Sequence, residues 1–197
     1  MSPIRAFIAI PLPAHLQQQI HRETNSLRAQ LSREIVRWVP AENIHITLKF
    51  LGDTEKEKLD KLEEILAIEM AKIHSFEITI KNLGVFPKMS RPSVIWVGVE
   101  NSGKLSTLHQ RVQRVASQIG SVQEKRRFSA HLTLGRVTRK GYNSKMRSKI
   151  RETLEESPKY DFGKVSVDSV HIFQSELTPK GAKHHSVFEA KLGDFFG

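Results

Sequence analysis

Apolar residues recur along this chain at two different spacings, and the spacing separates expected strands from expected helices. Strict alternation predicts a strand, whereas recurrence every three to four residues predicts an amphipathic helix. Alternation predicts strands at 5–10, 44–51, 76–81, 94–99, 128–136, 165–174 and 187–192. Helical spacing predicts helices over 16–31, 59–73, 105–119 and 145–156, the second opened by a capping box at 54–57 and the third capped by Ser102. The pattern therefore favours an α+β fold.

The order of these elements, and several residue spacings, indicate an internal repeat. His45 and His131 lie 86 residues apart, and Phe86 and Phe173 lie 87 apart, each phenylalanine followed six residues later by a proline. No low-complexity linker separates the two parts. We therefore expect a single domain over 1–197, a bilobal, pseudo-symmetric duplication. In it, two antiparallel sheets face a central cleft and the helices cover the outer faces.

Charge is distributed unevenly along the chain. The formal net charge is +10, and the stretch 125–151 alone carries ten basic side chains and no acidic one. Such clustering indicates a polyanionic partner, although a solvated face with its counter-charges brought in by folding is the alternative. The chain has no cysteine, which excludes disulfides, thiolate metal sites and a cysteine nucleophile. The apolar run at 7–11 is too short for a membrane span or a signal peptide, so a cytoplasmic location is expected.

Two short segments carry the candidate chemistry, each with the pattern apolar-His-apolar-Thr-apolar. The first contains His45 and Thr47, and the second contains His131 and Thr133. Residues i and i+2 of a strand point to the same face, so each segment presents an imidazole beside a hydroxyl. An imidazole titrates near neutral pH and a hydroxyl can donate to a phosphate oxygen. Two imidazoles across a cleft can divide proton donation and acceptance, as a metal-free phosphodiester displacement requires.

Neighbouring residues offer weaker candidates for substrate binding. Alternation places Lys49 on the same face as the first motif, where it could neutralise a phosphate. Arg136 has the opposite parity to the second motif and should point away unless the strand bulges after Gly135. Phe7 and Phe50 could stack on a base, although apolar strand residues more often belong to the core.

A zinc site is the competing interpretation of the histidines. Zinc requires a third and a fourth ligand at suitable spacing, and only His171, His184 and His185 are candidates. No His-x-x-x-His pair supports such a site, so we expect neither a metal nor another cofactor.

The chain resembles the two-histidine phosphoesterase superfamily, and within it the RNA 2′,3′-cyclic phosphodiesterases, also called 2′-5′ RNA ligases (the LigT or ThpR family). The resemblance runs nearly the full length, through the segments 5–10, 38–40, 45–52, 83–87, 94–99, 131–136 and 175–181. Two positions depart from the pattern of many members. Ala130 stands where they have proline, and His184 where they have tyrosine.

The resemblance implies a role for each motif residue. His45 would donate a proton to the leaving ribose oxygen, His131 would accept one from the attacking water, and Thr47 and Thr133 would hold the phosphate oxygens. It also implies an RNA partner with a 2′,3′-cyclic phosphate or 2′-5′ linkage, hydrolysis to a 2′-phosphate, and reversal to make a 2′-5′ bond. No membrane and no obligate protein partner are implied. The alternatives are a non-catalytic RNA-binding module of the same fold and a phosphodiesterase for small cyclic nucleotides.

Overall fold

The secondary structure of the chain is taken from a computed structural model that describes residues 2–100, 103–124, 126–139, 142–178 and 181–194. In chain order the elements are β1 Ile4–Pro11, α1 Ala14–Glu23, α2 Asn25–Gln30, β2 Val36–Trp38, the 3-10 turn η1 Ala41–Asn43, β3 His45–Thr54, α3 Lys56–Met70, β4 Phe76–Phe86, β5 Val94–Glu100, α4 Lys104–Ser117, β6 His131–Val137, α5 Ser144–Glu155, β7 Asp161–Val167, β8 Ser169–Thr178 and β9 Gly181–Lys191.

The helices follow the apolar stripes of the sequence, but their ends differ from those expected. The first stripe is divided into α1 and α2 at Thr24, which is fully buried and donates its hydroxyl to the carbonyl of Ile20. The capping box before α3 is wrong: Glu55 is the N-cap residue, no side chain caps the helix, and the Thr54 hydroxyl donates to Gly52 instead. Ser102, the expected cap of α4, lies outside the described residues.

The strands among the described residues form one curled antiparallel sheet in two halves. One half has the order β3-β1-β8-β9, and the other has β6-β5-β4-β7 with β2 beside β6. The halves meet where Ile46 of β3 pairs with Leu132 of β6, the one residue pair recorded between these two strands. The expected α+β duplication is thus confirmed, and its two sheets are the halves of a sheet joined at this seam.

Each half of the sheet contains strands from both ends of the chain. β4, from the first part of the sequence, pairs with β5 in the half of the sheet that contains β6. β8, from the second part, pairs with β1 in the half that contains β3. The two halves of the sheet therefore do not coincide with the two halves of the sequence.

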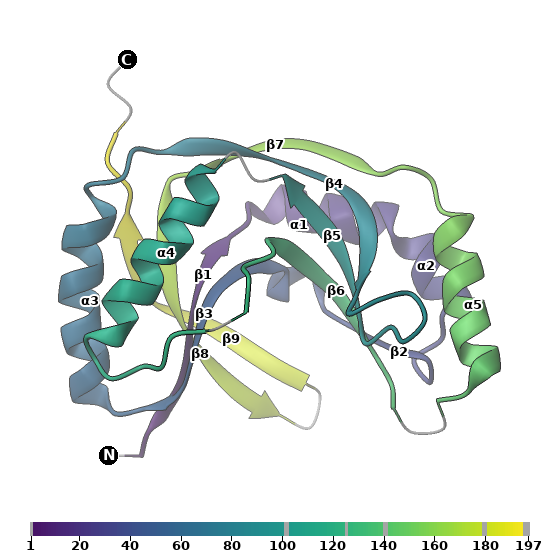
Figure 1. Ribbon diagram of the computed structural model, residues 1–197, viewed down its shortest axis with the longest axis horizontal. Helices are drawn as coiled ribbons and strands as arrows, with labels where there is room; N and C mark the ends of the chain where they lie inside the picture. The colour runs from purple at the N-terminus through teal and green to yellow at the C-terminus, as the bar shows by residue number, and fades with distance from the viewer. Residues whose placement is uncertain (1, 101–102, 125, 140–141, 179–180, 195–197) are drawn as a thin grey trace.

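Helices lie at both ends of the curled sheet (Figure 1). α3 packs beside α4 at one end, and α2 packs beside α5 at the other. The largest apolar cluster fills the space between helices and sheet, with Ile46 and Leu132 fully buried in it. No helix in the described part of the chain is long and apolar enough to cross a membrane.

Two strands were not expected from the alternation. β2 has three residues, too few to show a pattern, and it is fixed by pairing with β6. The stretch expected as a strand over 165–174 is divided at Asp168 into the end of β7 and the start of β8.

Candidate active site

His45 begins β3 directly after η1, with both ring nitrogens engaged. Its Nε2 lies 3.0 Å from the Thr47 hydroxyl, and the ring also forms a hydrogen bond to the backbone of Asn43. The ring stacks on Phe7 of β1 at a centroid distance of 4.9 Å. The imidazole is thus fixed in orientation, with Nε2 beside the hydroxyl of its own motif.

His131 begins β6 with the same local arrangement. Its Nδ1 lies 2.8 Å from the carbonyl oxygen of Ser129, two residues earlier. Because a carbonyl only accepts, Nδ1 must carry the proton, and neutral His131 therefore presents a lone pair at Nε2. The corresponding bond of His45 goes to Asn43, also two residues earlier.

The seam of the sheet brings the two motifs together. Ile46 pairs with Leu132, and both are buried on the core side of the sheet. The histidine and threonine on either side of each lie on the opposite face, because side chains alternate along a strand. Since the strands are antiparallel, His45 lies toward Thr133 and Thr47 toward His131. The four predicted residues therefore form a two-fold arrangement around one residue pair.

Burial favours the neutral form of both imidazoles. Burial, followed by the charge of His184, lowers the pKa of His45 to about 4, and the bond to Asn43 opposes this. Burial also lowers the pKa of His131, opposed by its bond to Ser129 and reinforced by the charge of Arg136. A proton donor at this site therefore needs a bound anion to raise its pKa.

The expected position of Lys49 is wrong, because a β-bulge follows the first motif. In the pairing of β1 with β3, Ile8 is opposite Lys49 and Ala9 is opposite Thr47, so one residue of β3 is left unpaired. The extra residue reverses the alternation. Lys49 turns to the helix-covered face, where it is 2% exposed. Phe50 takes the site face, 62% exposed and 6.3 Å from the ring of Phe7.

A matching bulge turns Arg136 toward the site. In the pairing of β5 with β6, Ile95 is opposite Gly135 and Trp96 is opposite Thr133. Arg136 thereby joins the face of the second motif, is exposed, and its charge lowers the pKa of both catalytic-candidate histidines. Simple alternation had predicted that Arg136 points away from the second motif, and the bulge reverses this.

Aromatic rings surround the two histidines in corresponding positions. Phe86 of β4 lies edge-on to His131 at 4.9 Å, and Phe173 of β8 stacks near His45 at 6.1 Å. These are the two phenylalanines separated by 87 residues, so the repeat spacing was the signal for them. His184 lies edge-on to His45 at 5.6 Å, and sequence reasoning assigned it no role at the first motif.

The described residues hold no cluster of three or more histidine, cysteine, aspartate or glutamate side chains that could bind a metal ion. His171 is held by Ser169 and Ser186, and His185 lies 3.7 Å from Glu176 on the surface. His171 and His185 are therefore engaged separately from each other.

The basic stretch is exposed along the second lobe. Within the described residues none of its basic side chains forms an ion pair, and all are exposed: Arg126, Arg127, Arg136, Arg139, Lys145, Arg147, Lys149 and Arg151. Lys125 and Lys140 lie outside the described residues. A counter-charge from elsewhere in the fold, the alternative considered for this stretch, is thus not found among the described residues.

Two His-x-Thr strands meeting at the seam of a duplicated antiparallel sheet define a two-histidine phosphoesterase. The sequence profile of the family described as "LigT like Phosphoesterase" matches the chain twice, over residues 10–96 and 97–184. The chain belongs to this family, and the double match reproduces the internal repeat.

Relatives and solved structures agree with this membership. An RNA 2′,3′-cyclic phosphodiesterase of Methanothermobacter thermautotrophicus is 35% identical over 178 residues, which is 90% of this chain and 93% of that protein. A protein of the same name from Thermotoga maritima is 32% identical over 192 residues, 96% of each chain. The crystal structure of E. coli LigT complexed with 3′-AMP superposes with a TM-score of 0.76 at 23% identity, covering 96% of this chain and 98% of that one.

Proposed function

We propose that the protein hydrolyses the 2′,3′-cyclic phosphate ends of RNA to 2′-phosphomonoesters, by general acid–base catalysis and without a metal ion. The observation that carries the proposal is the convergence of His45 and His131 at the seam, each with one ring nitrogen bound to a backbone carbonyl. Relatives that are 31–35% identical to this chain carry the name RNA 2′,3′-cyclic phosphodiesterase, which supports the choice of substrate. Because strands are exchanged between the two sheet halves, we propose that 1–197 acts as one bilobal domain.

The proposed reaction assigns one proton transfer to each imidazole. His131 takes a proton from water at Nε2 while the water oxygen forms a bond to phosphorus. The bond from phosphorus to the ribose 3′ oxygen breaks, and His45 donates a proton to that oxygen. The donor and acceptor roles follow the family resemblance, and the Nδ1–H of His131 supports its role as the base.

Threonine hydroxyls and one cation are proposed to hold the phosphate. Thr47 and Thr133 would donate to the non-bridging oxygens, and Arg136 would neutralise their charge. In the free protein His45 is neutral, since its pKa is about 4. Binding of the anionic substrate raises the pKa of His45, so that His45 becomes protonated and can act as the general acid.

RNA is the proposed partner beyond the cyclic phosphate, and the cytoplasm is the proposed location. The exposed basic side chains of α5, Lys145, Arg147, Lys149 and Arg151, lie free of acidic partners in the described structure and can follow a phosphate backbone. Neutralised phosphates release counterions, so affinity for an oligonucleotide should fall as salt rises.

The same groups support the reverse reaction. If the 5′ hydroxyl of a second RNA replaces water, His131 can deprotonate it, and a 2′-5′ bond forms as the cyclic phosphate opens. Neither direction requires ATP.

The test is incubation of the purified protein, in the presence of EDTA, with an oligonucleotide that ends in a 2′,3′-cyclic phosphate. We expect a 2′-phosphate product, a bell-shaped dependence of rate on pH, and weaker binding at higher salt. Binding without turnover would favour the non-catalytic module. Equal turnover of a cyclic mononucleotide with no salt effect would favour the small-substrate enzyme. Activity lost in EDTA and restored by zinc would overturn the metal-free reaction.

A further inference from the structure

Lys49 is the most deeply buried charged side chain among the described residues, and the proposed reaction does not use it. Only 2% of the residue is exposed. Its Nζ donates to the backbone carbonyl of Val122 at 2.5 Å and lies 3.9 Å from Oε1 of Glu124. Burying an ammonium group is costly unless it is hydrogen-bonded, so a side chain that only fills space there would be apolar.

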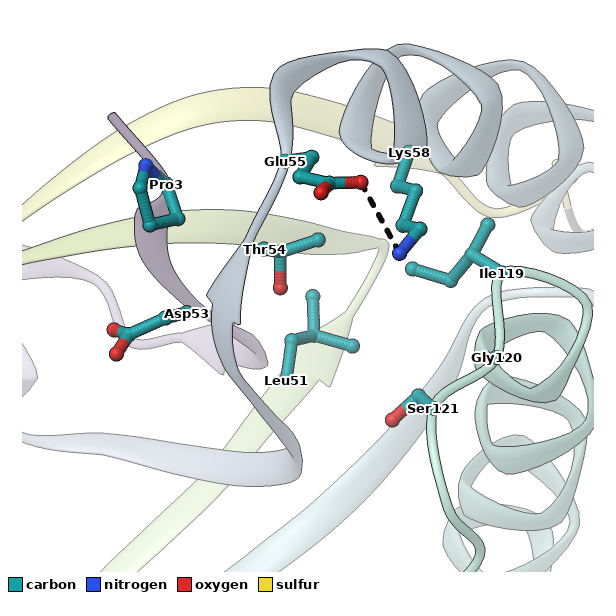
Figure 2. Close-up of a pocket in the computed structure, with 9 residues that line it drawn as sticks. All are labelled: Pro3, Leu51, Asp53, Thr54, Glu55, Lys58, Ile119, Gly120 and Ser121. Carbon is teal, nitrogen blue, oxygen red and sulfur yellow. Dashed lines mark ion pairs between the residues drawn. The ribbon is translucent and has the colours of Figure 1, made fainter. Parts of the chain in front are cut away.

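The residues held by Lys49 belong to the segment that leads from α4 to His131. Val122 shows an exposed side chain, 83% accessible, while its carbonyl turns inward to the amine. The turn just before it, Ile119, Gly120 and Ser121, lines a pocket of about 400 Å³ together with Leu51 of the same strand. Figure 2 shows these residues around the pocket. The start of the segment is therefore fixed to β3, the strand that carries the first motif.

Gln113 of α4 makes a second connection between the same strand and the same segment. Its Nε2 donates to the carbonyl of Leu48 at 3.3 Å and to Nε2 of His109 at 3.1 Å, and its Oε1 accepts from the backbone N–H of Glu124 at 3.5 Å. These partners fix the orientation of the Gln113 amide. If the amide were reversed, its NH₂ group would face the backbone N–H of Glu124, and two donors cannot form a hydrogen bond. Gln113 is 7% exposed, so these bonds replace water.

His109 carries the connection to the end of the segment. Its ring stacks on Phe128 with centroids 4.0 Å apart and planes 10° apart. Phe128 is followed by Ser129, whose carbonyl fixes Nδ1 of His131. The segment is thus held at Val122, Glu124 and Phe128, and its last contact lies one residue before the carbonyl that orients the second histidine.

We propose that Lys49 and Gln113 are positioning residues for His131. Both connect the bulge that follows the first motif to the segment before His131. Lys49 follows the bulge and donates to Val122, and Gln113 of α4 donates to the carbonyl of Leu48 in the bulge. One lobe therefore sets the ring orientation of the histidine in the other. The proposal deepens the proposed function, since it assigns a task in the same reaction.

The experiment compares Lys49→Met with Lys58→Met. Methionine has nearly the length of lysine and no donor. Lys58 is the matched control, because it is half exposed and its Nζ forms an ion pair with Glu55 at 3.2 Å, its one ion pair within the described residues. Figure 2 marks this pair with a dashed line. Two readouts are taken. The first is kcat and KM for a nucleoside 2′,3′-cyclic phosphate, which is too small to reach the basic side chains of α5. The second is the tautomer of His131 from the ¹⁵N chemical shifts of its ring.

For Lys49→Met we expect kcat to fall about tenfold to a hundredfold with KM within about twofold, since misplacement of a catalytic group acts mainly on turnover. We also expect signals of the Nε2–H tautomer of His131, because its Ser129 acceptor has moved. Lys58→Met should match the parent protein in both. If Lys49→Met does not fold, Gln113→Glu, which keeps the side-chain shape and removes the donor to Leu48 and His109, is tested by the same readouts.

A folded Lys49→Met or Gln113→Glu protein with an unchanged His131 tautomer and unchanged kcat overturns the proposal, and so does a loss of stability alone. The tautomer is measured without turnover. If the parent protein hydrolyses no cyclic phosphate, the proposed function fails while the positioning of His131 is still decided by the spectrum.

Discussion

The strands β3 and β6 begin with the same motif and the same bulge, but the two residues that follow the bulge differ in size, charge and polarity between the strands. On the buried side β3 has Lys49 where β6 has Gly135, and on the site side β3 has Phe50 where β6 has Arg136. The buried difference follows from the neighbouring strand: a Cβ at Gly135 would lie 2.5 Å from Val36 of β2, which has no counterpart beside Lys49. The site difference places an aromatic ring beside the first motif and a cation beside the second, on either side of the proposed phosphate position.

The two histidines also differ in their surroundings. His45 contacts the rings of Phe7, Phe173 and His184, whereas His131 contacts the ring of Phe86. The two motifs thus provide equivalent imidazoles with equivalent backbone bonds, and the aromatic rings around them distinguish the two. Four experiments test how far this comparison holds.

The largest effect should come from the histidines themselves. His45→Ala and His131→Ala should each lower turnover of a cyclic-ended oligonucleotide by about a thousandfold, because each removes one of two proton transfers. The double variant should be little worse than either single one, since the pair acts as a unit. Circular dichroism should show an unchanged fold. Near-parent activity in either single variant would end the assignment of paired roles.

Removing the cation on the β6 side should come next. Arg136→Met should lower kcat/KM by about a hundredfold, because a charge-assisted contact to the phosphate is lost. The charge of Arg136 lowers the pKa of both His45 and His131, so both pKa values should rise in the variant. An NMR titration of the ring protons measures this. Arg139→Met serves as the control, because Arg139 is also exposed and lies two residues after the end of β6.

The burial of His45 should make folding stability depend on pH. Its pKa falls from 6.5 in the unfolded chain to about 4 in the folded one, so the unfolded state binds the proton first as pH drops. Stability is therefore full above pH 6.5 and is lost as pH falls toward 4, by about 2 kcal/mol between pH 7 and pH 5. The free energy of unfolding is measured by urea denaturation at several pH values, and its dependence on pH should be weaker in His45→Gln than in the parent protein. Equal slopes would mean that His45 is not more strongly buried than an ordinary histidine.

The smallest effect should come from the aromatic ring on the β3 side. Phe50→Ala should raise KM for a cyclic-ended oligonucleotide about fivefold to tenfold with little change in kcat, because stacking of a base on an exposed ring contributes to binding. Phe50→Trp should restore the affinity. A fall in kcat with constant KM would instead place Phe50 in the phosphate site, as the counterpart of Arg136 by function as well as by position.

Alternation along the strands was sufficient to place the candidates His45, Thr47, His131 and Thr133 on one face, because all four precede the bulges. It failed for Lys49 and Arg136, which follow them. A bulge inserts one residue without changing the apolar pattern, since Leu48 and Leu134 are apolar whichever way they point. Family resemblance supplied the roles of the histidines, which no spacing could distinguish.

Tertiary contacts decided the remaining differences. The exchange of β4 and β8 between the sheet halves depends on pairing across the molecule, and β2 exists only through its pairing with β6. The hydroxyl of Thr54 had two possible partners nearby: it donates to the carbonyl of Gly52 and does not accept from a backbone N–H at the start of α3. The site of His131 depends on Lys49 and Gln113, which lie 82 and 18 residues earlier in the sequence.

The exchanged strands prevent the first repeat from completing either half of the sheet by itself. A polypeptide ending at residue 96 would leave β4 without β7 and with only the beginning of β5, and it would leave the outer edge of β1 without β8. The second part of the sequence supplies these partners, because β5 and β7 pair with β4 and β8 pairs with β1. Removal of either repeat would therefore expose unpaired strand edges in both halves of the sheet, so the two repeats must fold together.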